Sequence, residues 1–134
     1  MTRVGDQSLP IAVMLYYTFT SLDHQIPALL HSGYQVLYIS CETPIAGQKI
    51  SAKADDILKP GGAAEIVNNV LQALDIRDAP NKLIGGYDIG ASIALRMAAQ
   101  WPNRFAKVLA FHPSMGNTKA VKDEMAKIKA EVLV

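Results

Sequence analysis

Five short apolar segments alternate with amphipathic segments along this chain, and this alternation constrains the fold more than any other feature. The apolar segments are nearly continuous in hydrophobic residues, which is typical of strands that are covered on both faces. They are IAVMLYY (11–17), YQVLYIS (34–40), KLIGGYD (82–88), KVLAFHP (107–113) and EVLV (131–134).

Between the apolar segments, hydrophobic residues recur at helical spacing. This pattern predicts helices over 22–32, 62–75, 91–101 and 118–128, with Ser21 as N-cap of the first and Gly33 as its stop. Because strand and helix alternate, we predict an α/β fold: a three-layer sandwich of about five parallel strands with helices on both faces. The expected strand order is second, first, third, fourth, fifth.

Length and composition indicate a single domain over 1–134 and exclude several function classes. The net charge is +1 and no basic patch points to nucleic acid. Cys41 is the single cysteine and no apolar stretch is long enough to span a membrane, so we expect a cytoplasmic protein. The chain has no phosphate loop, dinucleotide motif or Cys/His cluster, and we expect neither cofactor nor metal.

The segment GGYDIGAS (85–92) places one carboxylate between small residues. A nucleophile elbow needs this pattern, because the central residue adopts unfavourable backbone angles and its neighbours two positions away come very close together. Asp88 is therefore the candidate nucleophile, and the following helix N-terminus favours its negative charge. The alternative is an ordinary strand-to-helix turn in which Asp88 caps the helix.

The segment GGYDIGASIALRMAAQWPNRFAKVLAFHPS resembles the elbow, helix and following strand of the α/β-hydrolase superfamily, and DHQIPALLHSGYQVLYIS (23–40) resembles the preceding helix and strand. The acid at the nucleophile position looks like the branch of epoxide hydrolases and haloalkane dehalogenases. The resemblance implies that Asp88 attacks carbon of a small apolar substrate and forms an ester, which a histidine oriented by a second acid then hydrolyses. It also implies that the Ile89 backbone N–H forms half of an oxyanion hole.

The chain departs from that family in three places. The usual His-Gly pair is replaced by a stretch that includes Tyr16 and Tyr17, whose phenols are candidate oxyanion donors. No lid is inserted after 107–113, and the chain ends at Val134, before the strands that carry the family's catalytic acid and histidine. We therefore expect an incomplete, truncated α/β-hydrolase core.

Other reactive side chains have simpler interpretations. His112 is the candidate base because it ends the strand beside Asp88, although a strand-end residue with an ordinary hydrogen bond is the simpler interpretation. We expect His24 and His31 to face solvent and Cys41 to be a buried, inert thiol. Ser92 is expected to bond backbone, and the pair Asp55-Asp56 to be solvated.

These features leave two functions open, beside a third interpretation in which the chain is a fragment with no function of its own. The first is a hydrolase of epoxides, alkyl halides or esters that uses Asp88, with His112 or a partner chain supplying the base. The second is a non-catalytic binding or assembly module descended from a hydrolase. In either case the apolar edge formed by EVLV predicts a homodimer or higher oligomer, built through this strand or helix 118–128.

Overall fold

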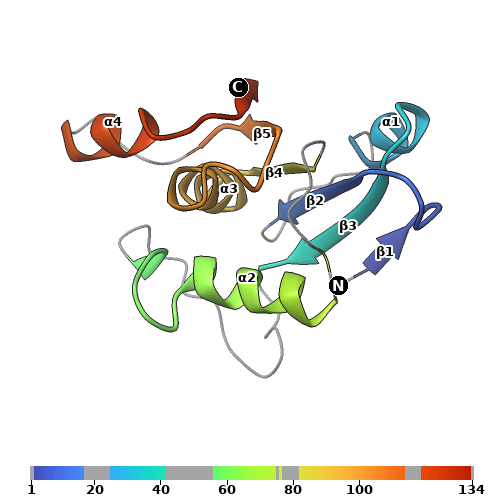
Figure 1. Ribbon diagram of the computed structural model, residues 1–134, viewed down its shortest axis with the longest axis horizontal. Helices are drawn as coiled ribbons and strands as arrows, with labels where there is room; N and C mark the ends of the chain where they lie inside the picture. The colour runs from blue at the N-terminus through green and yellow to red at the C-terminus, as the bar shows by residue number, and fades with distance from the viewer. Residues whose placement is uncertain are drawn as a thin grey trace.

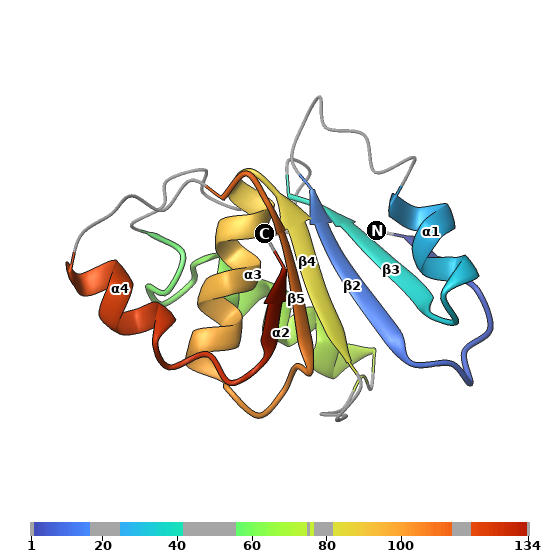
Figure 2. The same cartoon turned by 90° about the horizontal axis from the view of Figure 1, so that it is seen from above.

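The computed structural model describes residues 2–16, 25–41, 56–74, 76, 82–113 and 119–133. Its strands form one six-stranded sheet in the order β1-β3-β2-β4-β5-β6 (Figure 2). The strands are β1 (Thr2–Val4), β2 (Ile11–Tyr16), β3 (Gln35–Ser40), β4 (Leu83–Tyr87), β5 (Lys107–Phe111) and β6 (Glu131–Leu133). The helices are α1 (Gln25–His31), α2 (Ala63–Ala73), α3 (Ile89–Gln100) and α4 (Lys119–Met125).

The α/β prediction is confirmed, with one correction. Strands β2 to β6 pair in parallel and in the predicted order. The expectation of five strands, all parallel, missed β1, which pairs antiparallel with β3 at one edge of the sheet. A three-residue polar strand has no measurable periodicity, so the sequence gives no sign of it.

A buried glutamine explains why β1 forms. Gln35 is only 4% exposed, and its side-chain amide donates to the carbonyl oxygens of Gln7 (3.1 Å) and Leu9 (2.7 Å). Its side-chain oxygen accepts from Nε of Arg3 at 2.9 Å. These three bonds join the N-terminal segment to β3 across a large sequence separation, and they satisfy a polar group that burial would otherwise penalise.

The sheet is the middle layer of three, as predicted. Figure 1 shows α1 on one side of the sheet and α2 on the other. On the α1 side, Leu29 belongs to a cluster with Ala12, Met14, Val36 and Leu83. The larger cluster lies on the opposite side, where buried side chains of α2 and α3 cover the sheet. They include Ile66, Val67, Val70, Ile93, Ala94 and Met97.

The helices follow the predicted ranges with shorter ends. Helix α1 ends at His31, and Gly33 follows with φ of 91°, a left-handed angle that suits a glycine stop. The proposed cap Ser21 lies outside the described residues. Helix α3 begins at Ile89, two residues earlier than predicted, so the helix starts directly after Asp88.

Helix α4 is the most peripheral element. It lies beside α3 on the side away from β2 (Figures 1 and 2) and buries none of its residues. The Arg96 guanidinium on α3 holds it by two hydrogen bonds to the Glu124 carboxylate, Nε to Oε1 at 3.0 Å and Nη2 to Oε2 at 3.1 Å. None of the helices in the described ranges has the length and apolar character that a bilayer span requires.

Candidate functional site

Asp88 stands alone between β4 and α3, and its backbone is strained. Its φ of 55° and ψ of −116° lie outside the backbone regions that residues other than glycine normally adopt. Its N–H donates to the carbonyl oxygen of Phe111 at 2.9 Å, and its own carbonyl accepts from the N–H of Ser92 at 3.1 Å. The neighbouring strand and the helix therefore hold the strained angles in place from both sides.

The two glycines that flank Asp88 are required by contact with backbone atoms. A Cβ on Gly86 would lie 2.5 Å from both the Gly90 carbonyl carbon and the Leu15 carbonyl oxygen. A Cβ on Gly90 would lie 2.2 Å from the same Leu15 oxygen. Since real Cβ atoms do not approach so closely, the prediction that only very small residues fit two positions before and after Asp88 is confirmed.

The Asp88 side chain is exposed at the carboxyl edge of the sheet. Asp88 is the N-cap residue of α3, but within the described ranges its carboxylate makes no capping hydrogen bond to the helix. The strand-to-helix turn of the alternative interpretation is observed with Asp88 at the N-cap position, but without the side-chain bond of a cap. The carboxylate is available to a molecule that approaches from solvent, beside helix N–H groups that favour its negative charge.

His112 is the next residue on the neighbouring strand end. Tyr87 pairs with Phe111 in the β4–β5 register, so Asp88 and His112 follow each other side by side where these strands end. His112 also has a left-handed φ, 50°, and its exposed ring lies 5.3 Å from the Tyr87 ring, centroid to centroid. The two positive-φ residues other than glycine in the described chain are thus adjacent strand-end residues.

Two candidate oxyanion donors, Ile89 and Tyr16, lie at the carboxyl edge of the sheet. Ile89 opens α3, and the first N–H groups of a helix have no acceptor within the helix. Tyr16 ends β2, and its ring packs on the Tyr38 ring at 6.1 Å on the face that α1 covers. Its role as a donor remains a prediction, and Tyr17 lies outside the described residues.

The remaining candidates have structural explanations. Cys41 is buried, and burial raises the pKa of its thiol to about 12, as an inert thiol requires. The Ser92 hydroxyl bonds the Asp88 carbonyl oxygen at 3.4 Å, as expected of a backbone-bonding serine. Asp56 forms an ion pair with Lys59 at 3.0 Å, whereas Asp55, His24 and Ser114 lie outside the described residues.

Tyr87 is the residue of this site that the sequence analysis missed. It occupies the variable position before Asp88, so no motif distinguishes it, and its contact with His112 depends on the register of two strands. Within the described ranges, no group of three or more His, Cys, Asp or Glu side chains is placed to hold a metal ion.

Comparison with known proteins relates this chain to hydrolases. It is 34% identical over 107 residues to epoxide hydrolase B of Mycobacterium tuberculosis, a match that covers 78% of this chain. The chain spans 29% of the length of that relative. No family model matches the chain.

Solved structures show the same fold at lower identity. The epoxide hydrolase A structure from Mycobacterium thermoresistibile aligns with a TM-score of 0.59 at 24% identity, over 81% of this chain and 33% of that one. A carboxylesterase of Nitrososphaera gargensis aligns with a TM-score of 0.64 at 19% identity, over 90% of this chain and 43% of that one. The chain therefore has the α/β-hydrolase fold, and its sequence is epoxide hydrolase-like.

Proposed function

We propose that this chain carries the nucleophile of an α/β-hydrolase site and that Asp88 opens epoxides by forming a covalent ester. Alkyl halides and esters are further substrates of the same chemistry. The observation that carries the proposal is the strained, exposed Asp88 between β4 and α3, with glycines at the two positions where backbone atoms leave no room for a Cβ. The similarity to an epoxide hydrolase over this same region supports the choice of substrate class.

In the first step, a carboxylate oxygen of Asp88 attacks an epoxide carbon while the bond from that carbon to the ring oxygen breaks. The resulting alkoxide takes a proton from water or from the Tyr16 phenol. In the second step, water attacks the carboxyl carbon of the ester, and the Ile89 N–H stabilises the oxyanion that forms. The alkoxide departs and takes up a proton, which gives the diol. The carboxylic acid left on Asp88 gives its proton to the hydroxide or phenolate that remained from the first step, which restores the Asp88 carboxylate.

The second step needs a base, and we assign this role to His112. Its position beside Asp88 at the strand ends brings an imidazole within reach of water near the ester, and contact with Tyr87 limits the orientations of the ring. The imidazole takes the proton of the attacking water and returns it to the departing alkoxide, as general acid–base catalysis requires.

Mass spectrometry of the intact chain tests the first step. After incubation with an excess of a terminal alkyl epoxide, we expect an added mass equal to one epoxide, which peptide mapping places on Asp88. The Asp88→Asn chain, nearly identical in shape, should remain unmodified. The control Glu131→Gln removes an exposed carboxylate far from Asp88 and should be modified like the wild type. Equal modification of wild type and Asp88→Asn would contradict the proposal.

The lifetime of the adduct tests the base. Replacing His112 by glycine, which its φ of 50° accommodates, should slow loss of the adduct by roughly 100-fold or more. Added imidazole should restore part of the rate, because a free base can occupy the space that the side chain vacates. An adduct that disappears equally fast in His112→Gly would exclude His112 as the base while leaving the role of Asp88 intact.

A second candidate function is a non-catalytic assembly module. The specific observation in its favour is β6, whose three residues are all exposed and include Val132 and Leu133 at the end of the sheet. An absence of adduct together with a stable dimer would favour this function over hydrolysis.

A further inference from the structure

A groove lies between the last turn of α3, helix α4 and Leu58. Its volume is about 800 Å³, within the range of small-molecule sites. The residues that line it are Leu58, Ala99, Gln100, Pro102, Ala120, Asp123, Glu124, Ala126, Lys127 and Lys129. Ala99 lies 11 positions after Asp88, so along α3 the groove begins about 16 Å from the proposed nucleophile. The groove is therefore separate from the candidate active site.

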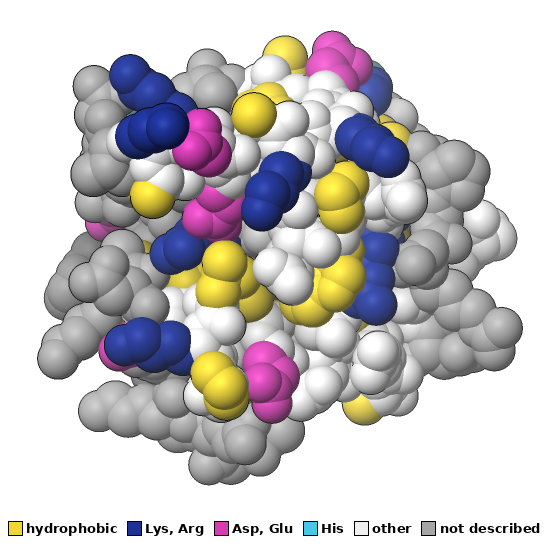
Figure 3. All heavy atoms as spheres, turned by 60° about the vertical axis from the view of Figure 1, so that its left-hand side comes forward, with side chains coloured by type: hydrophobic (Ala, Val, Ile, Leu, Met, Phe, Trp, Pro, Cys, Tyr) yellow, Lys and Arg dark blue, Asp and Glu magenta, His cyan; other side chains and the backbone are white. Residues whose placement is uncertain are grey.

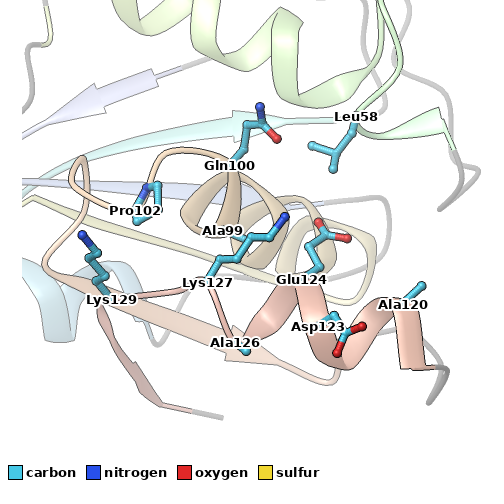
Figure 4. A pocket seen from close by; sticks show the side chains of 10 residues that line it. All are labelled: Leu58, Ala99, Gln100, Pro102, Ala120, Asp123, Glu124, Ala126, Lys127 and Lys129. Carbon is cyan, nitrogen blue, oxygen red and sulfur yellow. The ribbon is translucent and has the colours of Figure 1, made fainter.

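Half of the residues that line the groove are apolar. Three alanines, Leu58 and Pro102 present carbon to the opening, and Leu58 is 37% exposed, which is high for a leucine in this structure. In Figure 4 the Leu58 side chain points across the groove towards Ala99 and Glu124. A surface of this kind gains free energy when an alkyl group covers it, because apolar area leaves water.

Two lysines and two carboxylates line the groove, and one of the carboxylates is already paired with an arginine. Glu124 points into the groove, but both of its carboxylate oxygens already bond the Arg96 guanidinium, at 3.0 and 3.1 Å. The Lys127 side chain crosses the middle of the groove and ends, in the view of Figure 4, between Gln100 and Glu124, while Lys129 lies at the end near Pro102. Asp123 is the remaining carboxylate, and in Figure 4 it points away from Gln100 and Lys127.

The surrounding surface has the same character. Figure 3 looks at the side of the molecule that carries α4 and shows basic and acidic side chains interspersed with apolar patches. Helix α4 itself contributes Lys119 and Lys122 outside the groove. A ligand with an apolar body and a negative end fits the groove where Leu58 and the alanines lie beside Lys127 and Lys129.

We propose that this groove binds a small amphipathic carboxylate, such as a medium-chain carboxylic acid. Its alkyl chain lies along Leu58, Ala99 and Ala126, and its carboxylate accepts hydrogen bonds from the Lys127 ammonium and the Gln100 amide. A charge-assisted bond of this kind favours an anionic head group over a neutral or cationic one. The proposal is independent of the reaction at Asp88.

Titration of the isotope-labelled chain with decanoate, followed by amide NMR shifts, tests the proposal. We expect saturable shifts at Ala99, Gln100 and Ala126, and none at Asp88 or Ile89. Decan-1-ol should bind more weakly and decylamine more weakly still, since Lys127 repels a cation. Equal binding of the alcohol, tighter binding of the amine, absence of saturable shifts or shifts centred on Asp88 would each overturn the proposal.

Two variants and a matched control sharpen the test. Lys127→Gln should weaken decanoate binding by roughly 3- to 10-fold, because it removes one charge-assisted bond at a partly solvated site. Ala126→Phe, at an exposed position, should fill the groove and abolish saturable binding. Lys122→Gln removes the same charge from α4, outside the groove, and should bind like the wild type. If Lys122→Gln weakens binding as much as Lys127→Gln, the site is general attraction to a basic surface and the proposal is wrong.

Discussion

At the scale of single residues, Asp88 combines a solvent-exposed carboxylate with a strained backbone. Its φ of 55° and ψ of −116° suit glycine better than any side chain, and glycine at such a position removes a penalty of about 1–3 kcal/mol. A residue kept in this conformation despite the penalty is typical of functional sites, where stability and activity oppose each other. We therefore infer that the backbone strain at Asp88 is part of the functional site.

The first prediction follows directly from this strain. Asp88→Gly should raise the free energy of unfolding by about 1 kcal/mol and abolish the epoxide adduct. Urea denaturation measures the first effect and intact mass the second. Asn69→Gly, an exposed position within α2, should instead lose about 0.5 kcal/mol, since glycine is unfavourable inside a helix. A less stable Asp88→Gly chain would show that the Asp88 side chain supports the fold.

Cys41 makes stability depend on alkaline pH. Burial raises the pKa of its thiol from 9.0 to about 12, so the folded chain keeps a proton that the unfolded chain releases above pH 9. Folding stability should therefore be unaffected by Cys41 below pH 9 and fall by about 1.4 kcal/mol per pH unit from there towards pH 12.

Comparison with Cys41→Ala isolates this effect from the titration of lysines and tyrosines. The variant should lose less stability than the wild type between pH 9 and pH 10.5, as measured by urea denaturation. A thiol reagent at pH 8 should leave the folded wild type unmodified and react rapidly in urea. Parallel pH profiles of the two chains would contradict the burial of this thiol.

At the scale of elements, the Gln35 side chain links β1 and the following turn to β3. Gln35→Leu removes its bonds to Gln7, Leu9 and Arg3, and leaves two backbone carbonyls without that donor. We expect a loss of about 2–3 kcal/mol in the free energy of unfolding. Arg3→Ala removes one of the same bonds and should cost about 1 kcal/mol.

Hydrogen exchange locates the effect of Gln35→Leu. Amides of β1 and its β3 partners should exchange faster in the variant, whereas those of β4 and β5 keep their relative protection. A variant with wild-type stability would mean that the N-terminal strand contributes little to the fold.

The elements that the sequence predicts are those with local causes. Strands β2 to β5 are continuous apolar segments and are readable before the structure. The G-x-D-x-G pattern at 86–90 is readable as a motif, although the backbone contacts that require its glycines include the distant Leu15 of β2. Strand β1 depends on Gln35, more than 20 residues away, and has no pattern of its own. The first turn of α3 is hidden because Gly90 is a poor helix former.

The candidate site also contains features that the sequence predicts and features that it does not. Asp88 and Ile89 follow from the pattern of small residues around the acid. The position of His112 beside Asp88 also follows from the sequence, because the two residues end neighbouring predicted strands. The contact of its ring with Tyr87 and the left-handed backbone at both strand ends depend on how the two strands align. Such features arise from tertiary pairing, which periodicity does not encode.

At the scale of the whole molecule, the sheet ends at β6 without a further strand in the described part of the chain. Val132 is 36% exposed and Leu133 is 51% exposed, and an apolar edge of this kind is a template for pairing with another strand. We expect two copies to pair through β6, which would join their sheets. The homo-oligomer predicted from the sequence remains a prediction.

Sedimentation equilibrium at micromolar concentration measures this assembly. The wild type should sediment as a dimer or larger species, and Leu133→Lys as a monomer, because a lysine at the paired edge opposes association. Leu9→Lys introduces the same charge at a leucine that is 37% exposed in a turn away from β6, and should leave the assembly intact. A monomeric wild type would contradict the pairing.

The central claim is that the Asp88 carboxylate forms an ester and that water then attacks its carboxyl carbon. The most direct measurement is turnover of an excess of protein over epoxide in water enriched in oxygen-18, followed by mass analysis of the peptide that contains Asp88. We expect one labelled oxygen in the Asp88 side chain after turnover, and an unlabelled peptide in Asp88→Asn. A labelled diol with an unlabelled Asp88 peptide would show that water opens the epoxide directly, and would contradict an ester intermediate on Asp88.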